Sequence, residues 1–257
     1  MNLFYINYLF YARYFFSLLA FSSILLHNIF KVINLTSFIL KIIGIITMLF
    51  DHIGDAIIGK FSFFNLIGRI AFPIFAFQAV QGYIHTKDLK KHMIKLLIFA
   101  CISQIPFMLF LSTFTDIFVL NIFFTFFLAL LTLFIYDKCK NKILGFLSVI
   151  ISSIIGELIH VDYGAFGILL IFAFYFLKDK KILMLISSII LCFAKYIPNI
   201  LEYPSLYMHY LLCALFTCFS LIFIWFYNKK QGPKSKYFFY IFYPLHLLIL
   251  YIIHMVL

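Results

Sequence analysis

An aspartate and a histidine stand side by side in an otherwise apolar stretch of the chain, ITMLFDHIGDAI at residues 46–57. Asp55 follows Asp51 at the spacing of one helical turn. Ionisable side chains are costly in lipid, so those inside apolar segments usually serve a function. A histidine beside a carboxylate can act as a general base or as a nucleophile. Asp51 and His52 are therefore the first candidates for a functional site inside the membrane, where either chemistry or transport would use them.

The next apolar stretch, residues 64–86, carries an arginine at a similar depth. At 1.5 Å per helical residue, Asp51 and His52 lie about 10–12 Å, and Arg69 about 15 Å, from the intervening turn at Gly59. We expect Asp51 and Arg69 to form a buried ion pair, with His52 held beside it and oriented by Asp51. Such a pair could also simply pin two helices together, or belong to a proton pathway.

Other polar side chains inside apolar stretches extend this set. Gln78 and Gln81 follow Arg69 along the same stretch and are expected to line a polar route to the histidine. Asp162 and Tyr163 are expected at the outer mouth of the site. The further candidates are Gln104, Asn121 and His246, the last as an alternative base.

The amino-acid composition indicates that most of this chain lies in a lipid bilayer. Hydrophobic residues make up 65% of the 257 and charged residues 11%, which is too apolar for a soluble domain. We expect an all-α, polytopic helical membrane protein. The net charge of +11 could suggest nucleic-acid binding, but the positions of the lysines indicate topology signals instead, and no nucleic-acid partner is expected.

Most basic residues gather in four short loops, and lysine-rich loops of membrane proteins stay on the cytoplasmic side. Turn residues with few lysines interrupt the apolar stretches between these loops, which predicts a multi-pass bundle of about nine or ten helices in the cytoplasmic (inner) membrane. The loops contain Lys87, Lys90 and Lys91; Lys138, Lys140 and Lys142; Lys178, Lys180 and Lys181; and Lys229, Lys230, Lys234 and Lys236. The predicted spans are 37–58, 63–84, 92–112, 117–136, 143–160, 163–177, 182–198, 206–227 and 237–256.

Residues 1–34 are apolar enough to span a membrane but carry Arg13 near their middle. They are predicted to form an extra helix, separate from the multi-pass domain at 35–257; an interfacial segment or a misassigned start are the alternatives. Glu157 and His160 have a spacing that can serve a metal, but with no second pair no metal is expected.

Several blocks of the chain resemble the TraX family, in the same order. They are LKIIGIITMLFDHIG (40–54), IGRIAFPIFAFQAVQGYIHT (67–86), LLIFACISQIPF (96–107), LNIFFTF (120–126), DYGAFGILLIF (162–172) and KYFFYIFYPLHLLILYII (236–253). The resemblance runs from about Leu40 onward. The named member of that family is the conjugal-transfer membrane protein that acetylates the N-terminus of F-pilin.

The resemblance implies an integral-membrane acyltransferase that uses cytoplasmic acetyl-CoA. Carried over by motif, the catalytic set is Asp51, His52, Arg69 and His246, and the substrate-binding set is Gln104, Asn121, Asp162 and Tyr163. We expect Lys87, Lys90 and Lys91, or the loop at 229–236, to neutralise the phosphates of acetyl-CoA, with Gln78 and Gln81 along its arm. His52 would take a proton or be acylated itself, and Arg69 or Gln104 would stabilise the oxyanion.

The acceptor is left open among a peptide N-terminus, a pilin-like protein and a glycan amine or hydroxyl, and so is the oligomeric state. The alternative function is a small proton-coupled transporter, with the Asp51–Arg69 pair as a gate. The absence of an internal repeat in the sequence argues against it.

Overall fold

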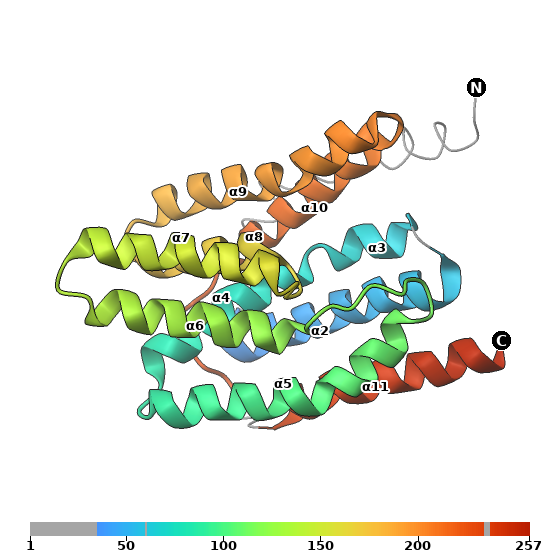
Figure 1. Ribbon diagram of the computed structural model, residues 1–257, viewed down its shortest axis with the longest axis horizontal. Coiled ribbons are helices and arrows are strands. Elements are labelled where there is room, and N and C mark those ends of the chain that lie inside the picture. Colours follow the sequence, from blue (N-terminus) through green and yellow to red (C-terminus); the bar gives the residue numbers. More distant parts are fainter. Residues whose placement is uncertain (1–34, 60, 234–236) are drawn as a thin grey trace.

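The computed structural model describes residues 35–59, 61–233 and 237–257. Over these residues the chain is helical and contains no named strand (Figure 1). The helices are α2 (Ser37–Ile53), the π-helical turn η1 (Gly54–Ile58), α3 (Phe63–Gly68), α4 (Ala71–His85), α5 (Leu89–Leu111), α6 (Ile122–Lys138), α7 (Lys142–Leu158), α8 (Gly164–Phe176), α9 (Lys181–Glu202), the 3₁₀ turn η2 (Pro204–Leu206), α10 (Tyr207–Trp225) and α11 (Phe238–Val256).

Each predicted span coincides with one helix or with two consecutive helices, which confirms the all-α membrane architecture. Within the described residues, six helical stretches are long and apolar enough to cross a membrane, so this is a multi-pass membrane protein. The helices α6 and α7 have 17 residues each and α8 has 13. The number of complete crossings stays a prediction, and the extra helix predicted at 1–34 lies outside the described residues.

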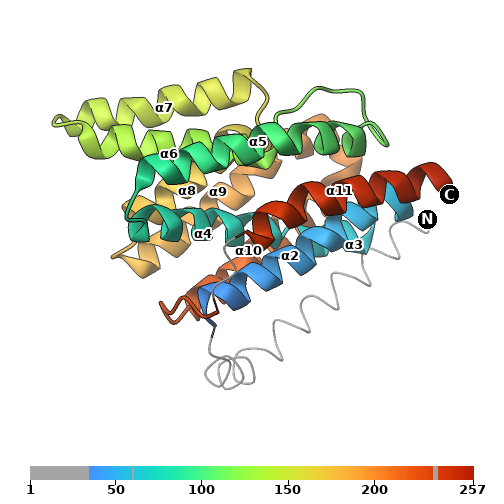
Figure 2. The same cartoon turned by 90° about the horizontal axis from the view of Figure 1, so that it is seen from below.

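Three of the lysine clusters gather at one end of the bundle, which we call the lysine-rich end. The turns α4–α5, α6–α7 and α8–α9 lie together there, on the left in Figure 1. The connection from α10 to α11 joins the start of α2, because the backbone N–H of Ser37 donates to the carbonyl of Lys230 at 2.8 Å. The first turn of α11 lies beside the first turn of α2, through Phe239 and Phe38, and beside Lys95 of α5, and α11 runs alongside both helices (Figure 2).

The connection from α5 to α6 departs from a simple hairpin. Residues 112–121 run back from the end of α5 toward the middle of the bundle, and α6 begins there (Figure 1). Leu120 forms an isolated parallel bridge with Val161 in the α7–α8 turn. This pairing draws the next residues of that turn, Asp162 and Tyr163, into the bundle.

The predicted span 63–84 is broken in two next to Arg69. Proline has no N–H to donate and its ring crowds the carbonyl four residues earlier, so helices rarely run through it. Pro73 stands in the first turn of α4, and Arg69 and Ile70 form a turn between α3 and α4 while their backbone dihedrals stay in the right-handed helical region. The break places the guanidinium of Arg69 against α2.

Candidate functional site

The predicted ion pair is present. Nη2 of Arg69 donates to Oδ1 of Asp51 at 2.7 Å, and Nδ2 of Asn65 donates to the same oxygen at 3.2 Å. The helices touch closely here, because a Cβ on Gly68 would lie only 2.2 Å from Cβ of Asp51. The carboxylate of Asp51 is therefore held by Asn65 of α3 and by Arg69, the residue directly after α3.

The predicted role of Asp51 in orienting His52 is wrong in this structure, because the partner of His52 is His246. Nδ1 of His52 lies 2.7 Å from Nε2 of His246. Nδ1 of His246 lies 2.8 Å from the carbonyl oxygen of Phe242. Neighbouring residues of a helix point in different directions, so the carboxylate of Asp51 faces α3 while His52 faces α11.

These contacts fix the tautomers of two neutral histidines. A carbonyl oxygen only accepts, so Nδ1 of His246 carries a proton and its Nε2 is an acceptor. Nδ1 of His52 must then donate to that acceptor. The lone pair on Nε2 of His52 is left as the basic and nucleophilic position, held by a hydrogen-bonded chain that ends on the backbone of α11.

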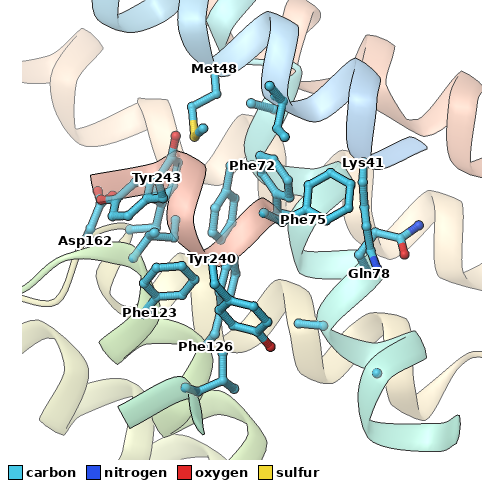
Figure 3. Close-up of a pocket in the computed structure, with 18 of the residues that line it drawn as sticks. Lys41, Met48, Phe72, Phe75, Gln78, Phe123, Phe126, Asp162, Tyr240 and Tyr243 are labelled. Carbon is cyan, nitrogen blue, oxygen red and sulfur yellow. The ribbon is translucent and has the colours of Figure 1, made fainter. Parts of the chain in front are cut away.

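A cavity of about 610 Å³ lies between α2, α4, α5, α6 and α11. Figure 3 shows its aromatic walls, with Asp162 and Tyr243 toward one end and Lys41 and Gln78 toward the other. The lining residues are Phe38, Lys41, Ile45, Met48, Asp51, His52, Ala71, Phe72, Phe75, Gln78, Ala79, Gly82, His92, Lys95, Leu96, Ile122, Phe123, Phe126, Asp162, Tyr163, Gln231, Pro233, Phe239, Tyr240 and Tyr243.

The two ends of the cavity differ. One end is buried and is bounded by Asp51, His52 and Asp162. The other end, which we call the mouth, includes the exposed residues Gln231 and Pro233, so the cavity opens near the lysine-rich end. The helical rise gives about 16 Å along α2 from the mouth to His52.

Some predicted site residues line this cavity and others do not. Asp51, His52, Gln78, Asp162 and Tyr163 line it. That Asp162 and Tyr163 lie at an outer mouth stays a prediction; the α7–α8 turn places both on the cavity lining with Asp51 and His52. The predicted residues outside the lining are Arg69, Gln81, Lys87, Lys90, Lys91, Gln104, Asn121 and His246.

Gln104 and Asn121 hold the backbone rather than the cavity wall. Nδ2 of Asn121 donates to Oε1 of Gln104 at 2.8 Å and to the carbonyl of Ala100 at 2.7 Å. Nε2 of Gln104 donates to the carbonyl of Val119 at 2.8 Å, and Oδ1 of Asn121 caps α6 through the N–H of Phe123. These bonds pin residues 112–121 to α5, which explains why two buried amides occur in apolar stretches.

Tyr163 forms one wall of the buried end in a strained conformation. Its φ of 65° is left-handed, a region that non-glycine residues seldom adopt. Its ring stacks on Phe72 with centroids 3.7 Å apart, and Nζ of Lys195 lies 4.0 Å from the ring centroid. Strain of this kind is found at functional positions more often than elsewhere.

Sequence reasoning missed three residues of the mouth, Lys41, His92 and Lys95. The signal was present for Lys41, because it shares one face of α2 with His52 at helical spacing, through Ile45 and Met48. The clustered loop lysines were expected to bind the phosphates instead.

The fold and the cavity together define a class: a multi-pass helical membrane protein with a pocket that ends on a paired histidine. The chain belongs to the TraX protein family, whose profile matches residues 37–254, and the resemblance is confirmed. The probable fimbrial assembly protein FimC, serogroup H1, of Dichelobacter nodosus is 28% identical over 237 residues, which cover 85% of this chain and 95% of that protein. No solved structure gives a significant match.

Proposed function

We propose that this protein is an acyltransferase that moves an acetyl group from acetyl-CoA to an amine or hydroxyl acceptor at the membrane. The observation that carries the proposal is the cavity that opens near the lysine-rich end and ends on His52, whose Nε2 is kept free to take a proton. Its depth of about 16 Å suits a long, slender arm that carries a thioester at its tip.

The transfer is one displacement at the thioester carbon. Nε2 of His52 takes the proton of the attacking amine or hydroxyl as that nitrogen or oxygen bonds to the carbonyl carbon. The carbon–sulfur bond then breaks, and the leaving thiolate takes the proton from His52. The acceptor leaves acylated, CoA leaves as its thiol, and the histidine returns to its neutral form. His246 accepts the Nδ1–H bond throughout and stabilises the transient imidazolium.

The oxyanion needs a hydrogen-bond donor in the cavity wall. Neither Arg69 nor Gln104 lines the cavity, so the earlier expectation for these residues is not carried forward. Tyr243 lines it one helical turn before His246. Its hydroxyl carries a hydrogen that can be donated. We assign this hydroxyl to the developing oxyanion.

The acceptor is most simply a peptide amine or a pilin-like protein. The relative from Dichelobacter nodosus carries the name of a fimbrial assembly protein, which favours a pilus-related acceptor over a glycan. At the buried end, the carboxylate of Asp162 provides a counter-charge for an acceptor ammonium before it loses a proton. We place the lysine-rich end in the cytoplasm, because lysines of short loops are retained there.

Sealed vesicles test the activity and the orientation together. Labelled acetyl-CoA does not cross a bilayer, so inside-out vesicles containing the protein should transfer label from outside to a native membrane acceptor, and right-side-out vesicles should not. Vesicles with the folded His52→Gln variant should be inactive. Label in right-side-out vesicles alone would reverse the orientation. Absence of transfer in both, with acetyl-CoA on each side, would remove the enzyme proposal and favour the transporter.

A further inference from the structure

The mouth of the cavity gathers basic side chains from two helices. Lys41 comes from α2, and His92 and Lys95 come from α5. His92 lies within electrostatic range of both lysines. Lys41 and Lys95 therefore form one positively charged rim, and the imidazole of His92 stands beside them as a hydrogen-bonding group.

No described carboxylate neutralises this rim. The two acidic residues of the lining, Asp51 and Asp162, belong to the buried end. Neither lysine forms an ion pair with a carboxylate among the residues that the structure describes. Like charges gathered without a counter-ion cost free energy, which a bound anion would offset.

Aromatic rings hold both ammonium groups in place. Nζ of Lys41 lies 5.3 Å from the ring centroid of Phe239, and Nζ of Lys95 lies 5.4 Å from Tyr237 and 5.8 Å from Tyr240. A ring face positions a cation without removing its charge. The rim is thus ordered and still positive.

A buried amide below the rim lacks a partner. Gln78 is only 7% exposed, and its Oε1 accepts from Oγ of Ser37 at 2.5 Å. Its Nε2 has no hydrogen-bond partner among the described residues, although buried polar groups are nearly always bonded. Gln78 lines the cavity beside Lys41 (Figure 3). Its N–H groups therefore lack an acceptor among the described residues, and a molecule bound in the cavity beside Gln78 can supply one.

We propose that the mouth is a phosphate-binding subsite. Lys41, His92 and Lys95 bind the phosphates of a CoA-type nucleotide, and Nε2 of Gln78 donates to an amide carbonyl of its pantetheine arm. The assignment rests on the proposed function for the identity of the nucleotide, but the anion site itself rests on the charges and the unpartnered amide. It replaces the predicted role of Lys87, Lys90 and Lys91, which lie outside the lining.

Binding measured by calorimetry tests the subsite without any turnover. The ligands are CoA, 3′-dephospho-CoA and pantetheine, and the proteins are wild type, Lys41→Gln, Lys95→Gln and Lys90→Gln. The last is the matched control, because Lys90 is an exposed lysine of the same helix as Lys95 and does not line the cavity. Thermal unfolding verifies that each variant is folded.

We expect wild type to bind CoA at least about tenfold more tightly than pantetheine, since charge-assisted hydrogen bonds to phosphate would be lost. Lys41→Gln and Lys95→Gln should each weaken CoA binding by about tenfold and make CoA binding less dependent on salt. Pantetheine binding should be unchanged in both variants. Lys90→Gln should bind like wild type. Equal affinity of wild type for CoA and pantetheine, or an equal effect of Lys90→Gln, would overturn the subsite.

Two further outcomes distinguish the phosphate-subsite proposal from the acyltransferase proposal. Equal rates of transfer from acetyl-CoA and S-acetylpantetheine would remove the subsite and keep the acyltransferase. CoA binding that depends on Lys41 and Lys95, without transfer to any acceptor, would keep the subsite and remove the acyltransferase.

Discussion

Nδ1 of His52 donates to Nε2 of His246 over 2.7 Å, across a sequence separation of 194 residues. The contact joins α2 to α11 and makes the two histidines unequal, because His52 lines the cavity and has its Nε2 lone pair free, whereas His246 lies outside the lining and is bonded at both nitrogens.

Replacing His52 with Gln should lower kcat for acyl transfer by about 10²–10⁴, the range expected for loss of a general base. KM for acetyl-CoA should stay near the wild-type value, because the mouth is unchanged. His254→Gln is the control: Nδ1 of His254 lies 2.6 Å from the carbonyl of Ala56, away from the cavity. A folded His52→Gln protein with full kcat would refute the assignment of the base.

His246 should behave as a positioning residue. Replacing it with Leu leaves Nδ1–H of His52 without its acceptor and should lower kcat by about 10–100-fold, as for other groups that orient a functional histidine. His246→Gln, which keeps an acceptor, should recover part of this loss. The pH profile of kcat distinguishes the role: its acid limb should move in His246→Leu, and an unchanged profile would mean that His246 only fills space.

Tyr243→Phe removes one hydroxyl from the cavity wall. We expect kcat to fall by about 10²-fold with little change in KM, since an oxyanion donor acts mainly in the transition state. Tyr240→Phe is the matched control, as it makes the same change in the same helix and also on the cavity. Equal losses in both variants would contradict the assignment of Tyr243.

The Asp51–Arg69 pair should matter for stability. Arg69→Gln leaves the largely buried carboxylate of Asp51 unpaired and should cost about 3–5 kcal/mol of unfolding free energy, whereas the double variant Asp51→Asn, Arg69→Gln should recover part of it. Lys91→Gln breaks the exposed pair with Asp88, in which the two side chains are 85% and 45% exposed, and should leave the unfolding free energy nearly unchanged. Denaturation in detergent measures each. If the loss of unfolding free energy in the double variant equals the sum of the losses in the two single variants, the two residues are not coupled.

Asn121→Ala should lower the stability of the fold without changing the binding of the acyl donor, acetyl-CoA. Loss of the cap on α6 and of the bonds to α5 should cost about 1–3 kcal/mol. KM for acetyl-CoA should stay unchanged in the folded fraction. A higher KM at unchanged melting temperature would restore Asn121 to the substrate-binding set.

Hydropathy and lysine spacing predicted the helices well, because both follow from where lipid and water lie along the chain. The helix ends were less predictable. The span expected from residue 117 begins at Ile122, since Asn121 caps it, and α9 continues through Pro198 to Glu202. Neither the start of α6 nor the end of α9 follows from hydropathy.

The site was predictable only where its parts are close in sequence. Asp51 and Arg69 belong to consecutive apolar stretches, so counting residues from Gly59 brought them together. No sequence spacing links His52 to His246. A polar residue in an apolar stretch also does not reveal whether its partners are backbone groups, so the sequence did not show that Gln104 and Asn121 bond to the backbone.

The pairing of α2 with α11 also sets when the protein can first act. Of the described helices, α11 is the last to leave the ribosome, and proteins gain structure in the order of synthesis. Until α11 inserts, His52 lacks its orienting partner and the cavity lacks the wall that holds Tyr240 and Tyr243. Under the proposed function, a partly synthesised chain in the translocon would therefore not consume thioester, and transfer would begin only once the bundle is closed.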